Sequence, residues 1–141
     1  MIVRRGVAIC HYNRERNLRE LIKSVKATTP EDTKIVVCDD GSINWPPDDA
    51  PMGEFGDDVS RICRKEKVLL IQGKNLGVAA NKNRALWALQ DCHFLAILED
   101  DLKPIEEGWF NIYEEATMAS GIHHFCRVQD KVVLEKVEEF Y

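Results

Sequence analysis

The chain has 141 residues, a length typical of one domain that buries a real core, and it is 45% hydrophobic and 30% charged, as soluble globular proteins usually are. Its formal net charge of −5 argues against a surface that coats nucleic acid. No signal peptide is predicted, and no apolar stretch approaches the ~20 residues of a membrane span. The five cysteines are scattered without metal-ligand spacing, which indicates buried thiols in a reducing cytoplasm rather than disulfides or structural zinc.

The first forty residues predict a strand, a helix and a second strand. Gly6 to Cys10 is a short apolar run, and a helix is expected to start near Arg14 with Asn13 as its cap and to end before Pro30. Its apolar positions fall on one helical face: Leu18, Leu21, Ile22 and Val25. The run Lys34 to Cys38 is the second strand, so the two strands should be parallel and connected right-handedly.

The middle of the chain repeats the alternation of helix and strand. The proline-containing stretch 43–56 is expected to be a surface loop, followed by a short helix, Asp58 to Lys65, and a strand, Val68 to Ile71. A turn at Gly73 to Gly77 leads into a helix from Val78 to about Leu89. We expect three of its side chains to face inward: Leu86, Trp87 and Leu89.

The last third adds a strand from His93 to Leu98, a helix from Trp109 to Ala119, a strand from Ile122 to Val128 and a helix from Lys131 to Tyr141. Strands that alternate with helices predict an α/β fold with a largely parallel sheet flanked by helices. We expect residues 1–141 to form a single domain.

Acidic residues follow two of these strands. Glu99, Asp100 and Asp101 come directly after one, and Asp39 and Asp40 after another. Either acidic group alone would be typical of a turn or a helix cap. Together they predict a ligand crevice at the carboxyl ends of the strands, where a divalent cation and the phosphates that it carries would offset the repulsion between the acids.

These segments resemble, in order, the motifs of family 2 glycosyltransferases with the GT-A fold. Val7 to Arg14 is similar to the family's first strand and its Tyr-Asn-Arg turn, and Ile35 to Ser42 to its Asp-Asp-Gly-Ser segment. Asn75 to Asn83 is similar to its Asn-x-Gly-x-x-x-(Arg/Lys)-Asn helix start. Glu99 to Asp101 stands at its Asp-x-Asp position, although it reads Glu-Asp-Asp. The resemblance covers residues 3–104, the nucleotide-sugar-binding half.

The resemblance implies a Rossmann-like GT-A fold and a metal-dependent, inverting transferase of the hexosyl or N-acetylhexosaminyl class. It implies a nucleotide-sugar donor, most simply a uridine diphosphate sugar, with Mn²⁺ or Mg²⁺ as cofactor and a glycan, lipid or protein as acceptor. The chain ends near the point where the family's acceptor-binding half would continue, so we expect either a minimal acceptor half or a fragment.

The resemblance also assigns roles to individual acids. Asp101 would ligate the metal with support from Asp100, and Glu99 would face the ribose or donor sugar or else remain a solvated residue. Asp40 would accept the ring N–H of uracil, the alternative being that it caps a turn with Ser42. The candidates for the general base that deprotonates the acceptor are Glu106, Glu107 and Asp130.

Further residues are expected around the donor. The turn after the first strand would line the base pocket and approach the phosphates: Cys10, His11, Tyr12, Asn13 and Arg14. The loop and helix that follow the third strand would shape the rim and reach the diphosphate: Asn75, Gly77, Lys82 and Asn83. Arg84 is a further candidate to meet the diphosphate, but we expect it rather on a solvated helix face. His123 or His124 would be a third metal ligand or, alternatively, a surface or structural histidine.

Two other functions compete with this reading. A nucleotide-sugar-binding remnant or fragment would hold a donor without transferring it. A sugar nucleotidyltransferase has a similar fold but requires a glycine-rich basic loop after the first strand, and Cys10 to Arg14 contains no glycine.

Overall fold

The computed structural model describes residues 3–42 and 59–125. The chain divides into two compact units, Met1–Phe110 and Asn111–Tyr141, which are described separately. The single domain expected over residues 1–141 therefore stays a prediction. The loop expected at 43–56, the helix expected at Lys131 to Tyr141, and Asp130 lie outside the described residues.

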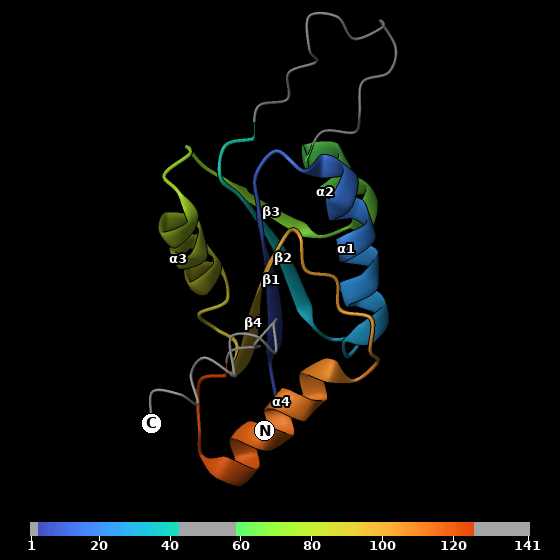
Figure 1. The fold of residues 1–141 in the computed structure, drawn as a ribbon, viewed down its shortest axis with the longest axis vertical. Helices are drawn as coiled ribbons and strands as arrows, with labels where there is room; N and C mark the ends of the chain where they lie inside the picture. The colour runs from blue at the N-terminus through green and yellow to red at the C-terminus, as the bar shows by residue number, and fades with distance from the viewer. Residues whose placement is uncertain (1–2, 43–58, 126–141) are drawn as a thin grey trace, which may run out of the picture. The chain divides into compact units, whose positions relative to one another are not determined.

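A parallel sheet forms the centre of the first unit. Its strands are β1 (Arg5–His11), β2 (Lys34–Asp39), β3 (Leu69–Gln72) and β4 (Phe94–Glu99). They lie in the order β3-β2-β1-β4, and every neighbouring pair is parallel (Figure 1). The first four predicted strands and the parallel α/β architecture are confirmed, with strand ends shifted by a residue.

Helices cover both faces of this sheet. Helices α1 (Glu15–Thr28) and α2 (Val59–Glu66) pack on one face, and α3 (Val78–Ala88) packs on the other (Figure 1). Because successive side chains of a strand point to opposite faces, β1 sends Val7 and Ile9 toward α1 and α2, and Ala8 and Cys10 toward α3. Each face thereby contributes its own apolar core.

The predicted amphipathic face of α1 is confirmed, but its predicted cap is wrong. Leu18 and Ile22 are completely buried in the core. Asn13 has a left-handed backbone with φ of 52°, and Arg14 takes the capping position without a side-chain hydrogen bond to the helix. The N–H of Asn13 instead donates to Ser42 Oγ at 2.9 Å, so this residue ties α1's start to the turn after β2.

The inward face of α3 also differs from the expectation. Leu89, just after the helix, is fully buried, but 45% of Leu86 and 71% of Trp87 are exposed. The helix rests on the sheet through the smaller side chains of Asn81 and Ala85. These positions define a face that turns Leu86 and Trp87 outward.

The second unit begins within α4 (Trp109–Ser120). Residues 122–125 form neither strand nor helix, so the described part of the strand expected at Ile122 to Val128 is wrong. The rings of Tyr113 and Phe125 meet edge to face, with centroids 5.9 Å apart. Among the described residues, no helix is long and apolar enough to cross a membrane.

The corrected face of α3 is testable with a matched pair of leucines. Leu89→Ala should lower the free energy of unfolding by about 2–5 kcal/mol, because it removes a fully buried side chain and leaves a cavity above Gly6. Leu86→Ala should change it by less than about 1 kcal/mol, since this side chain is half exposed. Urea unfolding of both variants measures the difference, and equal losses would contradict this orientation of α3.

Candidate functional site

The carboxyl ends of the strands meet at one edge of the sheet. In the observed register His11 of β1 lies beside Asp39 of β2, and Asp39 lies beside Gln72 of β3. On the other side of β1, Cys10 is paired with Glu99 of β4. The acids that follow β2 and β4 therefore emerge at the same edge, where open α/β sheets bind ligands.

Asp100 is the buried member of the acidic triplet. Its Oδ2 accepts the N–H of Tyr12 at 3.1 Å, and its Oδ1 accepts Nη1 of Arg14 at 3.0 Å. Its side chain is only 8% exposed, so the carboxylate depends on these donors for the interactions that water would otherwise provide. Asp100 thus fastens the end of β4 to the turn between β1 and α1.

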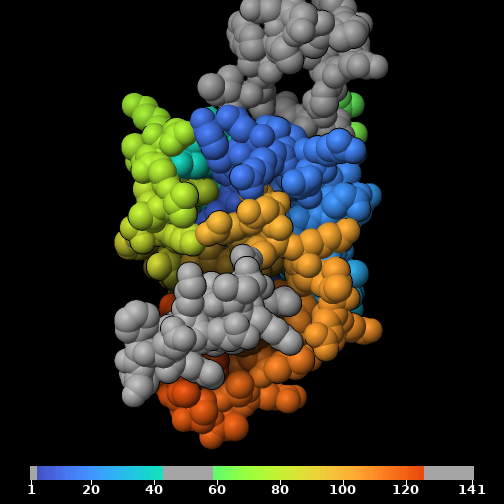
Figure 2. Space-filling view, viewed as in Figure 1, coloured from blue at the N-terminus to red at the C-terminus, as the bar shows by residue number. Residues whose placement is uncertain are grey.

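The other two acids of the triplet are open to solvent. The carboxylate of Asp101 is more than half exposed, and its Oδ2 lies 3.4 Å from the same Arg14 Nη1. Glu99 forms an ion pair of 2.6 Å with Nζ of Lys82 on α3. In the space-filling view, the segment after β4 lies directly against the β1–α1 region (Figure 2).

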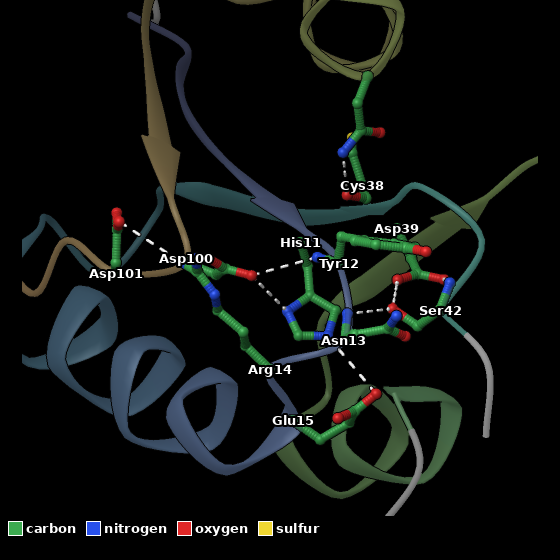
Figure 3. Close-up of polar contacts among 11 residues, drawn as sticks. His11, Tyr12, Asn13, Arg14, Glu15, Cys38, Asp39, Ser42, Asp100 and Asp101 are labelled. Carbon is green, nitrogen blue, oxygen red and sulfur yellow. Dashed lines mark hydrogen bonds and ion pairs between the residues drawn. The ribbon is translucent and has the colours of Figure 1, made fainter. Parts of the chain in front are cut away.

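His11 has a buried side chain that belongs to the opposite side of β1 from Cys10. Its imidazole lies between Asp100 and Glu15, with Nδ1 3.2 Å from Asp100 Oδ2 and Nε2 3.9 Å from Glu15 Oε1 (Figure 3). The side chain is completely buried. The His11 side chain therefore packs behind Asp100, although neither ring nitrogen makes a hydrogen bond.

Asp39, which sequence reasoning left without a role, organises the turn after β2. Its Oδ2 accepts the N–H of Ser42 at 3.0 Å, and its Oδ1 accepts the Ser42 hydroxyl (Figure 3). Its Oδ2 also accepts Nε2 of Gln72 at 2.9 Å. The alternative in which Asp40 caps a turn with Ser42 is wrong, because Asp39 makes that contact. An Asp three residues before a Ser at a strand end is the signal that could have identified this Asx turn.

Asp40 is directed toward the loop before α3. Its Oδ1 accepts the N–H of Leu76 at 3.1 Å and Nη1 of Arg84 at 2.6 Å, and its Oδ2 accepts the N–H of Gly77 at 2.9 Å. The expectation that Arg84 lies on a solvated helix face is therefore wrong. Its side chain is 19% exposed, and its Nη2 also donates to the carbonyl of Lys74. Arg84 and Asp40 hold this loop against the end of β2.

The hydrogen bonds of Asp40 determine its ionisation. Burial by itself would raise the pKa of Asp40, but the N–H of Leu76, the guanidinium of Arg84 and the N–H of Gly77 together outweigh it and lower the pKa below its usual range. The carboxylate consequently stays charged at neutral pH.

The turn after β2 and the loop before α3 pack too closely for a side chain between them. Gly41 has φ of +78°, and a Cβ there would lie 2.8 Å from the backbone N of Asn75 and 2.9 Å from the carbonyl oxygen of Gly73. Both atoms belong to the backbone, so they have little room to give way. Glycine at position 41 is therefore needed both for the conformation and for the contact.

The thiols near this edge are unreactive structural groups. Burial raises the pKa of Cys10 to about 12 and that of Cys38 to about 11. Both side chains lie in the core under α3, where Nδ2 of Asn81 donates to the carbonyl of Cys38 at 2.8 Å. The side chain of Cys10, which was expected to line the pocket, lies in this core as a protonated thiol.

Most of the predicted donor-site residues thus gather at the edge, in two groups. The β1 and β4 side holds Tyr12, Arg14, Asp100 and Asp101. The β2 and α3 side holds Asp40, Asn75 and Gly77, together with Arg84, which was expected elsewhere. Lys82 reaches Glu99, and Asn83 is exposed on α3.

Two of the proposed general bases are not at this edge. The N–H of Gly108 donates to the carbonyl of Thr28 in the last turn of α1, which lies at the amino-end side of the sheet (Figure 1). Glu106 and Glu107, which directly precede Gly108, are brought to that side because the chain runs back along α1 after Asp101. The structure therefore does not support them as bases, and His123 and His124 belong to the second unit.

A divalent cation fits a site at which several side-chain oxygens converge on one point. Among residues 3–42 and 59–125, no group of three or more His, Cys, Asp or Glu side chains could hold a metal ion. Asp100 Oδ1 and Asp101 Oδ2 nevertheless both point to one cationic nitrogen, that of Arg14. Two hard oxygens completed by phosphates and water suit Mg²⁺ and chemically similar ions.

The comparison with known proteins agrees with this fold and edge. The model of glycosyl transferase family 2 matches residues 6–118, which include the four strands described above, except for Arg5, and the acidic segments. The chain belongs to this family, and its four-stranded parallel sheet with flanking helices is a GT-A type fold. No curated protein matches the chain.

The pKa of Asp40 leads to a prediction for acid stability. Asp40→Asn should lower the free energy of unfolding at pH 7 by about 1.5–3 kcal/mol, the usual effect of losing hydrogen bonds to a charged group. Because the pKa is lower in the folded state, this contribution is complete above the unfolded pKa of about 3.9 and is lost as the pH falls through the lower folded value.

Denaturant unfolding of wild type and Asp40→Asn at several pH values between 7 and the acid transition measures this difference. The gap between the two proteins should narrow below about pH 4. Asp32→Asn is the control, because Asp32 is an exposed aspartate whose pair with Arg5 is 3.6 Å long. A gap that is constant with pH would contradict the role of the Asp40 charge.

Proposed function

We propose that this family 2 glycosyltransferase transfers a sugar from a uridine diphosphate sugar, with inversion and with help from Mn²⁺ or Mg²⁺. The observation that carries the proposal is the convergence of Asp100 Oδ1 and Asp101 Oδ2 on one cation at the strand-end edge. The Asp40 carboxylate lies on the other side of the same edge, at the end of β2. A base-recognition group and a cation-binding group would thus flank one ligand.

The diphosphate would lie near the turn between β1 and α1. Arg14 is half exposed there, and Lys82 of α3 extends to Glu99 from the other side of the sheet. Their charges would offset an anion that a protein of net charge −5 cannot offset through its overall field. When bound, the metal ion would act as a Lewis acid on the charge that develops on the departing nucleotide.

Asp40 retains the capacity to recognise a base. An ionised carboxylate offers about four lone-pair positions, and the contacts to Leu76, Gly77 and Arg84 use three of them. The remaining position belongs to Oδ2, which accepts only the N–H of Gly77 among the contacts given above. That position could accept the ring N–H of uracil, while Tyr12, which is 41% exposed, would flank the base.

The alternative of a sugar nucleotidyltransferase gains no support from the turn after β1. That activity requires backbone N–H groups of a glycine-rich loop around a triphosphate. Here the N–H of Tyr12 is engaged by Asp100 and that of Asn13 by Ser42. Two of the amides that such a loop would present are therefore already used.

Binding of uridine diphosphate sugars should depend on a metal. In titration calorimetry with a panel of these donors, at least one should bind more tightly with Mn²⁺ than with a chelator, because its diphosphate completes the metal's ligands. Asp101→Asn should reduce that gain by about tenfold or more. Release of uridine diphosphate on adding Mn²⁺, with or without an acceptor, would then test turnover directly.

Two acids of the triplet provide the control for this experiment. Asp101→Asn should leave the free energy of unfolding within about 0.5 kcal/mol, because its carboxylate is exposed. Asp100→Asn should lower it by about 1–3 kcal/mol, because it removes a buried acceptor. Equal donor affinity with and without metal, in a folded protein, would remove the basis for the metal assignment.

A second prediction concerns Asp40 and the base. Asp40→Asn should weaken uridine diphosphate binding by about 1.5–3 kcal/mol, because the amide that replaces the carboxylate is a poorer acceptor for the ring N–H. Binding of pyrophosphate, measured in parallel with the same metal, should change much less. An equal loss for pyrophosphate would mean that Asp40 acts on the phosphates or the metal instead.

A further inference from the structure

Arg14 holds the position at which the two outward oxygens of the acidic triplet converge. Its Nη1 donates to Asp100 Oδ1 at 3.0 Å and to Asp101 Oδ2 at 3.4 Å (Figure 3). The guanidinium is thus shared by two carboxylates from adjacent residues of the same segment. It neutralises part of the repulsion between them while no other cation is present.

Asp100 cannot turn away from this position. Its other oxygen, Oδ2, is fixed by the N–H of Tyr12, and the buried imidazole of His11 lies 3.2 Å behind it. The carboxylate therefore presents Oδ1 and little else outward. Arg14, in contrast, is 53% exposed and stands at the start of α1, so its long side chain is free to take another orientation without disturbing the core.

We propose that Arg14 is an exchangeable counter-cation, which rests on the proposed function. In the free chain it occupies the place of the divalent ion, and it moves to the diphosphate when metal and nucleotide bind together. Metal–oxygen bonds of about 2.1 Å are much shorter than the N···O distances of Arg14, so ion and guanidinium compete for the same two oxygens. Two cations in one place would also repel each other.

The exchange couples the two ligands. Metal alone must displace Arg14 into water, whereas metal with a diphosphate gives the guanidinium a new anion for bidentate binding. Metal should therefore bind weakly to the free chain and more tightly in the presence of nucleotide. Since such coupling is reciprocal, the metal should raise the affinity for the nucleotide by the same factor.

The test measures Mn²⁺ binding rather than activity. The affinity for Mn²⁺ is determined by electron paramagnetic resonance of the free ion, with and without uridine diphosphate, for wild type, Arg14→Gln and Arg14→Lys. Arg16→Gln is the matched control, because it removes the same charge from an exposed position of α1 two residues away. Thermal unfolding checks that each variant is folded.

Arg14→Gln should bind Mn²⁺ alone about two- to fivefold more tightly than wild type, the range expected for removing a half-exposed ion pair. The factor by which uridine diphosphate raises the Mn²⁺ affinity should fall by at least as much. Arg14→Lys should recover part of that factor, and Arg16→Gln should match wild type.

The outcomes separate this inference from the proposed function. If wild type binds Mn²⁺ and uridine diphosphate cooperatively, and Arg14→Gln keeps both the affinity and the coupling factor, the exchange is wrong while the proposed function stands. An identical change in Arg16→Gln would reduce the effect to net charge and likewise overturn the exchange. If no variant binds Mn²⁺ even with uridine diphosphate, both the exchange and the proposed metal site are wrong.

Discussion

Three carboxylates are buried at the strand-end edge, and each takes most of its hydrogen bonds from donors within the protein because little water reaches it. Asp39 takes them from the turn after β2 and from β3, Asp40 from the loop before α3, and Asp100 from the turn after β1. Asp39 joins its own turn to β3, whereas the contacts of Asp40 and Asp100 each join two different connections of the sheet. The need to satisfy buried charge therefore fixes the positions of the loops that surround the candidate site.

These hydrogen bonds distinguish acids whose oxygens are mostly engaged within the protein from acids whose side chains are open to solvent. Asp101 and Glu99 are about half exposed, whereas Asp39, Asp40 and Asp100 are almost completely covered. The sequence of the acidic triplet alone does not distinguish its buried acid from its exposed acids. Here the middle acid of the triplet anchors the segment to the turn after β1, and its exposed neighbour Asp101 lies beside the same guanidinium of Arg14.

The sequence predicted the sheet and its helices well, because apolar runs and helical spacing report directly on burial. It also predicted that the acids would meet, since parallel strands share a carboxyl edge. The prediction failed where contacts distant in sequence determine the position of a side chain. Arg84 lies on a helix whose sequence indicates a solvated face, but its guanidinium donates to Asp40 and is largely buried. The prediction failed likewise for Glu106 and Glu107, because the path of the chain after β4 follows packing against α1 and has no local signature. The burial of the His11 side chain could have been predicted from the sequence, because Val7, Ile9 and His11 are alternate residues of β1 and therefore share a face.

The strand order has a consequence for how the protein is made. β1 lies between β2 and β4, so during synthesis one of its edges stays without a partner until Phe94–Glu99 has left the ribosome. An unpaired edge in the centre of an apolar sheet is a template for wrong strand pairing between nascent chains. The bonds from Tyr12 and Arg14 to Asp100 also span more than 80 residues of sequence. Completion of the sheet and assembly of the acidic edge therefore both require β4 and the residues that follow it. Interruption of synthesis before residue 100 would leave an aggregation-prone intermediate rather than a partly working domain.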